Sequence, residues 1–263
     1  MRTHPQIPRS DQASFNILGV RVNAVQIADV VSRMREWIDR RDPCRYIAVT
    51  GMHGIMEAHH DPEFKEILNT AGMTVPDGMP LVWLARWKGH PLKRRVYGPD
   101  LMLSFCAATS RDGVRHFFYG GTPAVIENLA AELSSRFPGM KIAGAYSPPF
   151  RPLTAAEDRE AIAQIEAAAP DILWVGLSTP KQERWMREHS ALLNVPVMVG
   201  VGAAFDIHSK EKKQAPSWMR EHGLEWLFRL LQEPKRLWRR YVVYGSEFLL
   251  WITLDLLGLR RFE

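Results

Sequence analysis

The chain has 263 residues, of which 46% are hydrophobic and 24% are charged, and these proportions exclude a disordered or fibrous protein. Its two cysteines, Cys44 and Cys106, exclude a disulfide scaffold and a metal site built from cysteines. No apolar segment reaches the roughly 18 residues of a membrane-spanning helix, and the polar residues 1–15 predict no secretory signal. These features predict a cytoplasmic protein with reduced thiols.

The formal net charge of +5 is concentrated near the end of the chain, where residues 210–263 carry 11 basic and 7 acidic side chains, or +4. The same segment contains Trp218, Trp226, Trp238 and Trp251, which are four of the nine tryptophans. Basic residues interleaved with aromatic residues suit a membrane interface, and they also suit RNA. A helical subdomain that buries these tryptophans in its own core is the alternative.

Along the chain, short apolar runs typical of strands alternate with segments of helical periodicity. Strands are predicted at 46–50, 73–75, 116–119, 141–146, 171–176 and 197–201. Helical segments are predicted at 54–69, 81–88, 124–137, 155–169 and from about 181, and the pattern is only helical from about 217. This order predicts an α/β fold with a mostly parallel sheet and helices on both of its faces. We expect one domain over 1–209, followed by a basic, Trp-rich helical appendage over 210–263.

Ligands of an open parallel sheet bind beyond the carboxyl ends of the strands, so the residues after each predicted strand are candidates for a site. These positions are 50–51, 77–78, 120–122, 176–183 and 200–206. Several are rich in glycine and several lead into a helix, and both features favour a ligand that contains phosphate. No GxGxxG follows the first predicted strand and no GxxxxGK[ST] occurs, which disfavours a nicotinamide-dependent oxidoreductase and a P-loop enzyme.

Five segments, in order, resemble those of a known family. They are VPDGMPLVW (75–83), RVYGPDL (95–101), FFYGGTPAVIENLAAEL (117–133), VGLSTPKQERWM (175–186) and VGVGAAFDIHSKEKKQAPSWMREHGLEWLFRLLQEPKRLWRR (199–240). On these segments the chain is identified as a member of the WecG/TagA/CpsF glycosyltransferases, glycosyltransferase family 26. The resemblance extends from about Phe15 to Tyr244.

The resemblance implies an inverting transferase with a Rossmann-like catalytic domain and no metal or other cofactor. It would move a sugar from a UDP-sugar to a sugar carried by a polyprenyl diphosphate, peripherally at the cytoplasmic face of the membrane. The product would feed exopolysaccharide, teichoic acid linkage or common antigen synthesis. The appendage would complete the site and contact the anionic membrane surface. A homo-oligomer is compatible with these expectations, and a transferase of this kind is not expected to bind nucleic acid. The alternative function is that of an RNA-associated protein that binds through the basic appendage.

The resemblance also assigns catalytic residues, namely Asp77, Thr50 and Arg95. Asp77 matches the aspartate of the family's DG motif and is the expected base that deprotonates the acceptor hydroxyl. Pro-Asp-Gly is also a common turn in which Asp77 would only accept backbone hydrogen bonds, and Asp100 has the same ambiguity. Arg95 is expected to bind phosphate oxygens, with a solvated surface charge beside Lys93 as the alternative.

Donor-binding residues are expected in the matching strand-end loops. They are Gly120, Gly121, Pro180, Lys181, Gln182, Glu183, Gly202 and Asp206. The backbone of the two adjacent glycines resembles a nucleotide cradle, and the amide of Gln182 could bind uracil or ribose. The alternatives are packing at a strand-to-helix turn for the glycines and an exposed helix N-terminus for Gln182.

The appendage supplies candidate arginines for the acceptor diphosphate or for the membrane. They are Arg220, Arg229, Arg236, Arg239 and Arg240. Arg229, Arg236 and Arg240 recur at spacings of seven and four residues, which predicts one helical face, as a solvated face also would.

The apolar segment 242–259 follows these arginines and contains Glu247 and Asp255. Each carboxylate would cost roughly 2.5–3.5 kcal/mol near the centre of a bilayer. We therefore expect this segment to lie in the membrane interface or to form a packing surface for another subunit rather than to span the membrane.

One position departs from the family pattern. Members often have Thr-x-Asn after the first strand, whereas no asparagine follows Thr50, and His53 is the nearest candidate substitute. His53 could equally cap the next helix. This departure leaves the donor sugar open between glucose-type and N-acetylmannosamine-type donors. No DxD occurs, and the adjacent His59 and His60 would point to different sides of a helix, so no metal site is predicted.

Overall fold

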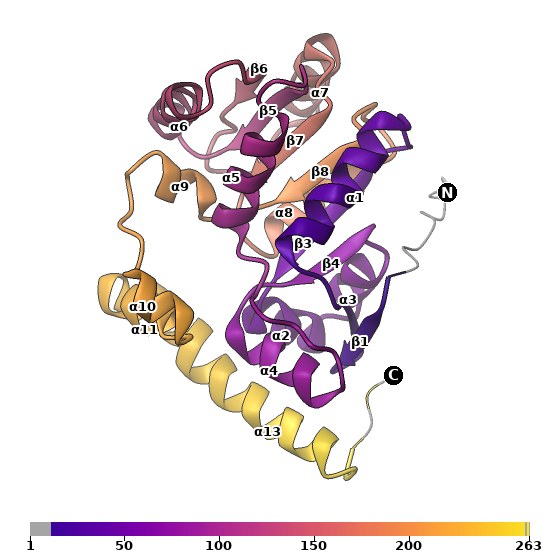
Figure 1. Ribbon diagram of the computed structural model, residues 1–263, viewed down its shortest axis with the longest axis vertical. Coiled ribbons are helices and arrows are strands. Elements are labelled where there is room, and N and C mark those ends of the chain that lie inside the picture. The colour runs from indigo at the N-terminus through magenta and orange to yellow at the C-terminus, as the bar shows by residue number, and fades with distance from the viewer. Residues whose placement is uncertain (1–11, 261, 263) are drawn as a thin grey trace.

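A parallel sheet of six strands lies at the centre of the computed structural model, which describes residues 12–260 and 262 (Figure 1). The strands are β3 (Arg45–Thr50), β4 (Met73–Pro76), β5 (Arg115–Gly120), β6 (Lys141–Tyr146), β7 (Ile172–Gly176) and β8 (Val197–Gly200). Their order is β4-β3-β8-β7-β5-β6, and every neighbouring pair is parallel. The predicted α/β class and parallel sheet are confirmed.

Alternate residues of each central strand enter two separate cores because successive side chains of a strand point to opposite faces. In β3, Tyr46 and Ala48 belong to one core, whereas Ile47 and Val49 belong to the other. Helices cover both faces, so the central strands are almost continuously apolar. The edge strand β6 is only partly buried and begins with the exposed Lys141.

The core that contains Tyr46 is covered by one group of helices. They are α2 (Met52–His60), α3 (Pro62–Asn69), α4 (Met79–Trp87), α7 (Ala155–Ala168) and α8 (Lys181–His189). A hairpin, β1 (Ser14–Ile17) and β2 (Val20–Asn23), also packs into this core and was not predicted. The predicted helical segment 54–69 is divided, because Asp61 caps α3 by accepting from the amide of Phe64 at 3.1 Å and Pro62 occupies the first turn.

The core that contains Ile47 is covered by a second group of helices. They are α1 (Ile27–Asp39), α5 (Gly98–Thr109), α6 (Pro123–Arg136) and the short α9 (Ala204–His208). The sequence pattern predicted α6 but neither α1 nor α5. Phe205 of α9 is buried against the carboxyl ends of β5 and β7, where it approaches Gly121 and Gly176.

The appendage consists only of helical elements in its described part, as predicted. They are α10 (Ser217–Glu221), α11 (Glu225–Gln232), α12 (Pro234–Trp238), a π-helical turn η1 (Arg239–Val243) and α13 (Tyr244–Leu256). Figure 1 shows α13, in yellow, lying along the body beside α2 and α4. Phe248 and Ile252 enter the core that contains Tyr46, and Glu247 pairs with His60 of α2 at 3.0 Å. The appendage is therefore packed on the body.

Three of the four tryptophans in the appendage are not buried in a local core. Trp218, Trp226 and Trp238 are exposed, whereas Trp251 packs against His59 of α2. Across residues 12–260 and 262, no helix is both long enough and apolar enough to cross a membrane. The segment predicted to lie in the membrane interface or against another subunit instead packs on the body of the same chain through Phe248 and Ile252, and it leaves Leu249, Leu250 and Leu257 exposed.

Candidate functional site

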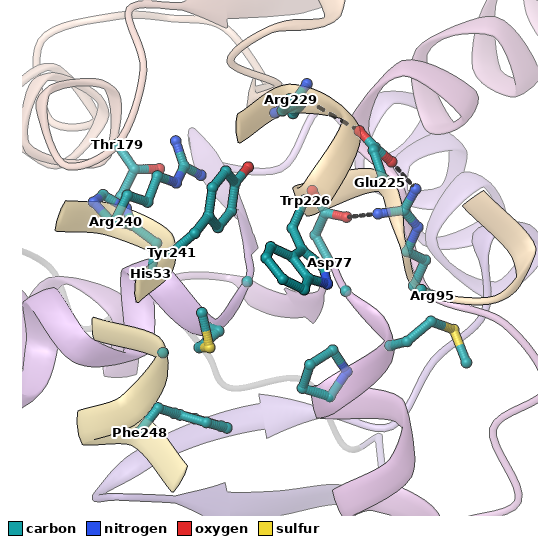
Figure 2. A pocket seen from close by; sticks show the side chains of 18 of the residues that line it. His53, Asp77, Arg95, Thr179, Glu225, Trp226, Arg229, Arg240, Tyr241 and Phe248 are labelled. Atoms are coloured by element: carbon teal, nitrogen blue, oxygen red, sulfur yellow. Dashed lines mark hydrogen bonds and ion pairs between the residues drawn. The ribbon is translucent and has the colours of Figure 1, made fainter. Parts of the chain in front are cut away.

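A cavity of about 880 Å³ lies between the carboxyl ends of the central strands and the appendage. The body contributes residues that follow β3, β4, β7 and β8, among them His53, Asp77, Thr179 and Gly202. The appendage contributes residues of α11, η1 and α13 from the opposite side, as Figure 2 shows. The volume is typical of a site for a small-molecule ligand.

The strand order explains why the cavity opens at this end of the sheet. The chain crosses from β3 to β4 on one side, whereas β8 pairs with β3 on the other side. Open α/β sheets bind ligands in the crevice at such a topological switch point, where the connections from neighbouring strands run in opposite directions. The ends of β5 and β6 lie at the far side of the sheet from β4, so their loops do not reach the cavity.

The backbone around Asp77 is held tightly at the end of β4. The Asp77 amide donates to the carbonyl of Thr50 at 2.8 Å, and a Cβ atom on Gly51 would lie 2.4 Å from the Asp77 carbonyl. Gly78 then adopts a φ of +130°, which favours glycine, and leads into α4. The Asp77 side chain is directed into the cavity and is 27% exposed (Figure 2). Its carboxylate is therefore available to a ligand rather than sealed within the turn.

Burial raises the pKa of Asp77 to about 6. The positive charge of Arg95 opposes this shift, while the negative charge of Glu225 adds to it. A carboxylate with this pKa is mostly ionised at neutral pH and is a stronger base than an ordinary aspartate. Both properties suit a group that removes a proton from a hydroxyl.

Arg95 connects the carboxylate of Asp77 to the appendage. Its Nη1 lies 3.5 Å from Oδ1 of Asp77, and its Nη2 forms a close ion pair with Glu225 of α11. Glu225 also accepts from the Tyr97 hydroxyl at 2.8 Å and lies 3.2 Å from Nε of Arg229. Burial alone would raise the pKa of Glu225, but Arg95, Arg229 and the hydrogen bonds outweigh burial and lower it. Glu225 is thus an ionised junction between body and appendage.

Glu225 was not among the site residues predicted from the sequence. Its only local signal is the four-residue spacing to Arg229, which is common on solvated helices. The burial of Glu225 and its pairing with Arg95 depend on docking of α11 against the body, which a local pattern does not reveal. Trp226 and Tyr241 also line the cavity without having been predicted.

Arg240 and His53 lie on the opposite side of the cavity from Arg95 (Figure 2). Within the described chain, Nε of Arg240 is buried without a hydrogen-bond partner, so this guanidinium retains donor capacity that an anionic ligand can satisfy. Burial, followed by the charge of Arg240, lowers the pKa of His53 to about 3. His53 is therefore neutral at physiological pH, with Nε2 at 3.2 Å from Glu57, and acts as a polar group rather than an acid.

The predicted site residues divide into two groups. Those that line the cavity are Asp77, Arg95, Gln182, Gly202, Asp206, Arg229, Arg236 and Arg240. Those that do not line it are Thr50, Gly120, Gly121, Pro180, Lys181, Glu183, Arg220 and Arg239. The three arginines predicted to share a helical face do line one cavity, although they come from α11, α12 and η1.

Thr50 does not line the cavity but lies behind Gly54, which does. Its side chain is buried beneath Gly54, and its carbonyl accepts the amide of Asp77. Thr50 thus positions the carboxylate of Asp77 through the backbone in this arrangement.

Gly120 and Gly121 have packing roles at the carboxyl end of β5. A Cβ atom on Gly120 would lie 2.6 Å from the carbonyl of Gly176, and one on Gly121 would lie 3.0 Å from Val125. Both glycines also have positive φ angles, +125° and +69°. The structure therefore supports the alternative of packing at a strand-to-helix turn for this pair.

The first turn of α8 uses its polar residues to support the cavity floor. Gln182 accepts from the Gly202 amide at 3.0 Å and donates to Glu183 at 2.9 Å, so its amide is already engaged. Glu183 is fully buried and also accepts from Thr179 at 2.8 Å. Lys181 is turned away from the floor and lies over the ring of Phe150 at 5.4 Å.

Four other predicted residues have partners within the protein. Asp206 pairs with Lys212 at 3.0 Å, and Arg220 lies 3.7 Å from Asp100. Arg236 pairs closely with Glu233. The guanidinium of Arg239 lies 5.8 Å from the ring centre of Tyr244. Arg240, by contrast, lines the cavity with an Nε that has no hydrogen-bond partner in the described chain, and Arg229 lines the same cavity while pairing with Glu225.

The residues that the structure describes contain no group of three or more His, Cys, Asp or Glu side chains arranged to hold a metal ion. Asp61, beside the two adjacent histidines, is instead paired with Arg184 of α8. Metal independence stays a prediction.

The fold and the cavity define an α/β enzyme whose strand-end site places a carboxylate opposite partly buried arginines. Residues 15–262 match the model of the glycosyl transferase WecG/TagA/CpsF family, and the chain belongs to this family. The predicted family is thus confirmed, and the protein is a glycosyltransferase.

Three curated relatives share one name, N-acetylglucosaminyldiphosphoundecaprenol N-acetyl-beta-D-mannosaminyltransferase. The protein of Bacillus spizizenii is 36% identical over 184 residues, which cover 70% of this chain and 69% of the relative. The protein of Bacillus subtilis is 34% identical over 181 residues, or 68% of each chain. The protein of Staphylococcus aureus is 28% identical over 232 residues, or 88% of this chain and 89% of the relative.

Proposed function

We propose that this protein transfers a sugar from a UDP-sugar to a sugar carried by a polyprenyl diphosphate, with inversion at the transferred carbon. One observation carries the proposal: the cavity holds Asp77, with a pKa raised to about 6, together with Arg229 and Arg240. The names of the relatives support both an acceptor on undecaprenyl diphosphate and an N-acetylmannosamine donor.

In the proposed reaction, a hydroxyl oxygen of the acceptor sugar attacks the anomeric carbon of the donor. The hydroxyl proton passes to the carboxylate of Asp77 as the new carbon–oxygen bond forms. The bond from the anomeric carbon to the diphosphate breaks, and its electron pair leaves on UDP. Attack from the face opposite the leaving group inverts the configuration.

Arginines supply the positive charge that the departing diphosphate requires. Arg240 has a buried Nε without a partner in the described chain, and Arg229 lies at the same cavity beside Glu225. Guanidinium groups bind phosphate oxygens through paired hydrogen bonds and are most effective where water is excluded. This arrangement supports a reaction that uses no metal ion, which is part of the proposal.

The same arrangement favours a small anionic substrate over RNA. Arg229 and Arg240 line a cavity between the body and the appendage, whereas a protein that tracks RNA needs its cations along an open groove. The exposed Trp218, Trp238 and Leu250 instead support peripheral attachment of the appendage to the cytoplasmic membrane surface, where the acceptor would be embedded.

A donor panel tests the proposal. The protein is incubated with N-acetylglucosamine linked to a polyprenyl diphosphate as the acceptor, with and without EDTA. The donors tested are UDP-N-acetylmannosamine, UDP-N-acetylglucosamine and UDP-glucose. We expect transfer from at least one donor, most rapidly from UDP-N-acetylmannosamine, at a rate that EDTA does not change. Absence of transfer from every UDP-sugar would overturn the proposed reaction, and loss of transfer in EDTA would overturn the absence of a metal.

A further inference from the structure

One end of the cavity is an apolar trough between α4 and α13. From α4 it is lined by one helical face, which consists of Met79, Pro80, Trp83, Leu84 and Trp87. From α13 it is lined by another, which consists of Phe248, Leu249, Ile252 and Leu256. Both sets follow the three- and four-residue spacing of a single helix face, so the two helices present apolar surfaces to the same space.

The trough has a buried floor and an exposed rim. Phe248, Ile252 and Leu84 are buried, whereas Trp83 and Trp87 are 52% and 63% exposed, and Leu249 is 67% exposed. Exposed apolar side chains that lie together in one patch are typical of a surface that binds a partner or a ligand. Lys88 and Asp255 lie 3.7 Å apart and link the same two helices.

The trough is continuous with the charged part of the site. A single cavity contains the apolar residues of α4 and α13 together with Asp77, Arg229 and Arg240. Figure 2 places Phe248 away from the Arg95–Glu225 pair and on the side of Arg240 and Tyr241. The cavity therefore complements an amphiphile that has an anionic group next to a long apolar chain.

We propose that the trough binds the first isoprene units of the acceptor's polyprenyl chain, with the acceptor's diphosphate at the charged end of the same cavity. This inference rests on the proposed function. It explains why apolar residues of the body, on α4, lie exposed beside the appendage, since they line the same cavity as the charged residues. A prenyl chain also suits aromatic and branched side chains better than water does.

Binding measurements without catalysis test the trough. Calorimetry compares farnesyl diphosphate, a fifteen-carbon chain, with dimethylallyl diphosphate, which has the same diphosphate on five carbons. We expect the longer ligand to bind the wild type at least about 10-fold more tightly, because its additional apolar surface is buried. We expect Leu249→Ser to reduce this preference severalfold without changing the affinity for the five-carbon ligand.

Leu250→Ser is the matched control, because Leu250 is 56% exposed on the same helix but does not line the cavity. It removes the same apolar group from α13 and should leave the chain-length preference intact. Equal affinity of the wild type for both ligands, or an equal effect of the two substitutions, would overturn the trough. Sugar transfer by the wild type is assayed in parallel. If the wild type prefers the longer diphosphate but transfers no sugar, only the proposed function is rejected. If it transfers sugar but shows no preference for the longer diphosphate, only the trough is rejected.

Discussion

Arg95 and Glu225 form a close ion pair that joins the loop before α5 to helix α11 of the appendage. The same guanidinium lies 3.5 Å from Asp77, so the appendage influences the expected base through one shared arginine. Glu225 competes with Asp77 for the positive charge of Arg95 and also repels the ionised carboxylate. Docking of the appendage and the basicity of Asp77 are therefore coupled.

The acid limb of the pH–activity profile follows from the raised pKa of Asp77. A base has to be ionised before it can accept a proton, and half of the Asp77 side chains are protonated near pH 6. We predict that kcat/KM rises roughly 10-fold per pH unit below this value and levels off above it. Initial rates at donor and acceptor concentrations well below KM measure kcat/KM over this range, and a flat profile between pH 5 and pH 7 would count against Asp77 as the base.

Glu225→Gln should move that limb to lower pH. The substitution removes a negative charge that raises the pKa of Asp77 and frees Arg95 to pair with Asp77 alone. A weaker base should also lower the plateau rate, by about 10-fold. Glu132→Gln is the control, because it makes the same charge change on α6, where Glu132 pairs with Lys210. A limb that moves equally in both variants would contradict the coupling of Glu225 to Asp77.

Asp77→Asn should stabilise the fold at high pH. The folded-state pKa of Asp77 is raised to about 6, so its contribution to stability is full below the unfolded pKa near 3.8 and is lost as pH rises through 6. Asparagine does not ionise, and the variant should exceed the wild type by about 1–3 kcal/mol in free energy of unfolding at pH 8. Urea unfolding at pH 4 and pH 8 measures this difference. The difference in free energy of unfolding, Asp77→Asn minus wild type, should be larger at pH 8 than at pH 4. A smaller difference at pH 8 would refute the prediction.

Membrane association is predicted to depend on exposed apolar residues of the appendage. Deleting the whole appendage, residues 210–263, would also remove Phe248 and Ile252 from the core, so substitutions on its surface are the cleaner experiment. Leu250→Ser combined with Leu257→Ser should reduce binding to anionic liposomes by about 10-fold or more. Leu192→Ser, an exposed leucine in the body, is the control. Unchanged sedimentation of the double variant with liposomes would exclude this face of α13 as the membrane contact.

The parts of the fold that sequence predicted are those that local patterns determine. The runs YIAVT and DILWVG are almost wholly apolar because both faces of the sheet are covered, and they became β3 and β7. The hairpin β1–β2 has four-residue strands with polar residues between the buried ones, so its signal was weak. Strand order depends on crossovers between distant segments, and no local pattern encodes it.

The same distinction applies to the site. Asp77 was predicted because its position after a strand and its match to a family motif are both visible in the sequence. The sequence also places Gly120 after a strand, but β5 lies far from β4 in the sheet, and that separation removes Gly120 from the cavity. Glu225 shows the opposite case, because its role arises only when α11 brings it to Arg95 and Tyr97.

The most direct test of the account measures turnover and UDP binding together in Asp77→Asn. If Asp77 is the base, turnover should fall by about 100-fold or more, while calorimetry should give an affinity for UDP close to that of the wild type. Turnover at the wild-type rate would contradict the role of Asp77 as the proton acceptor.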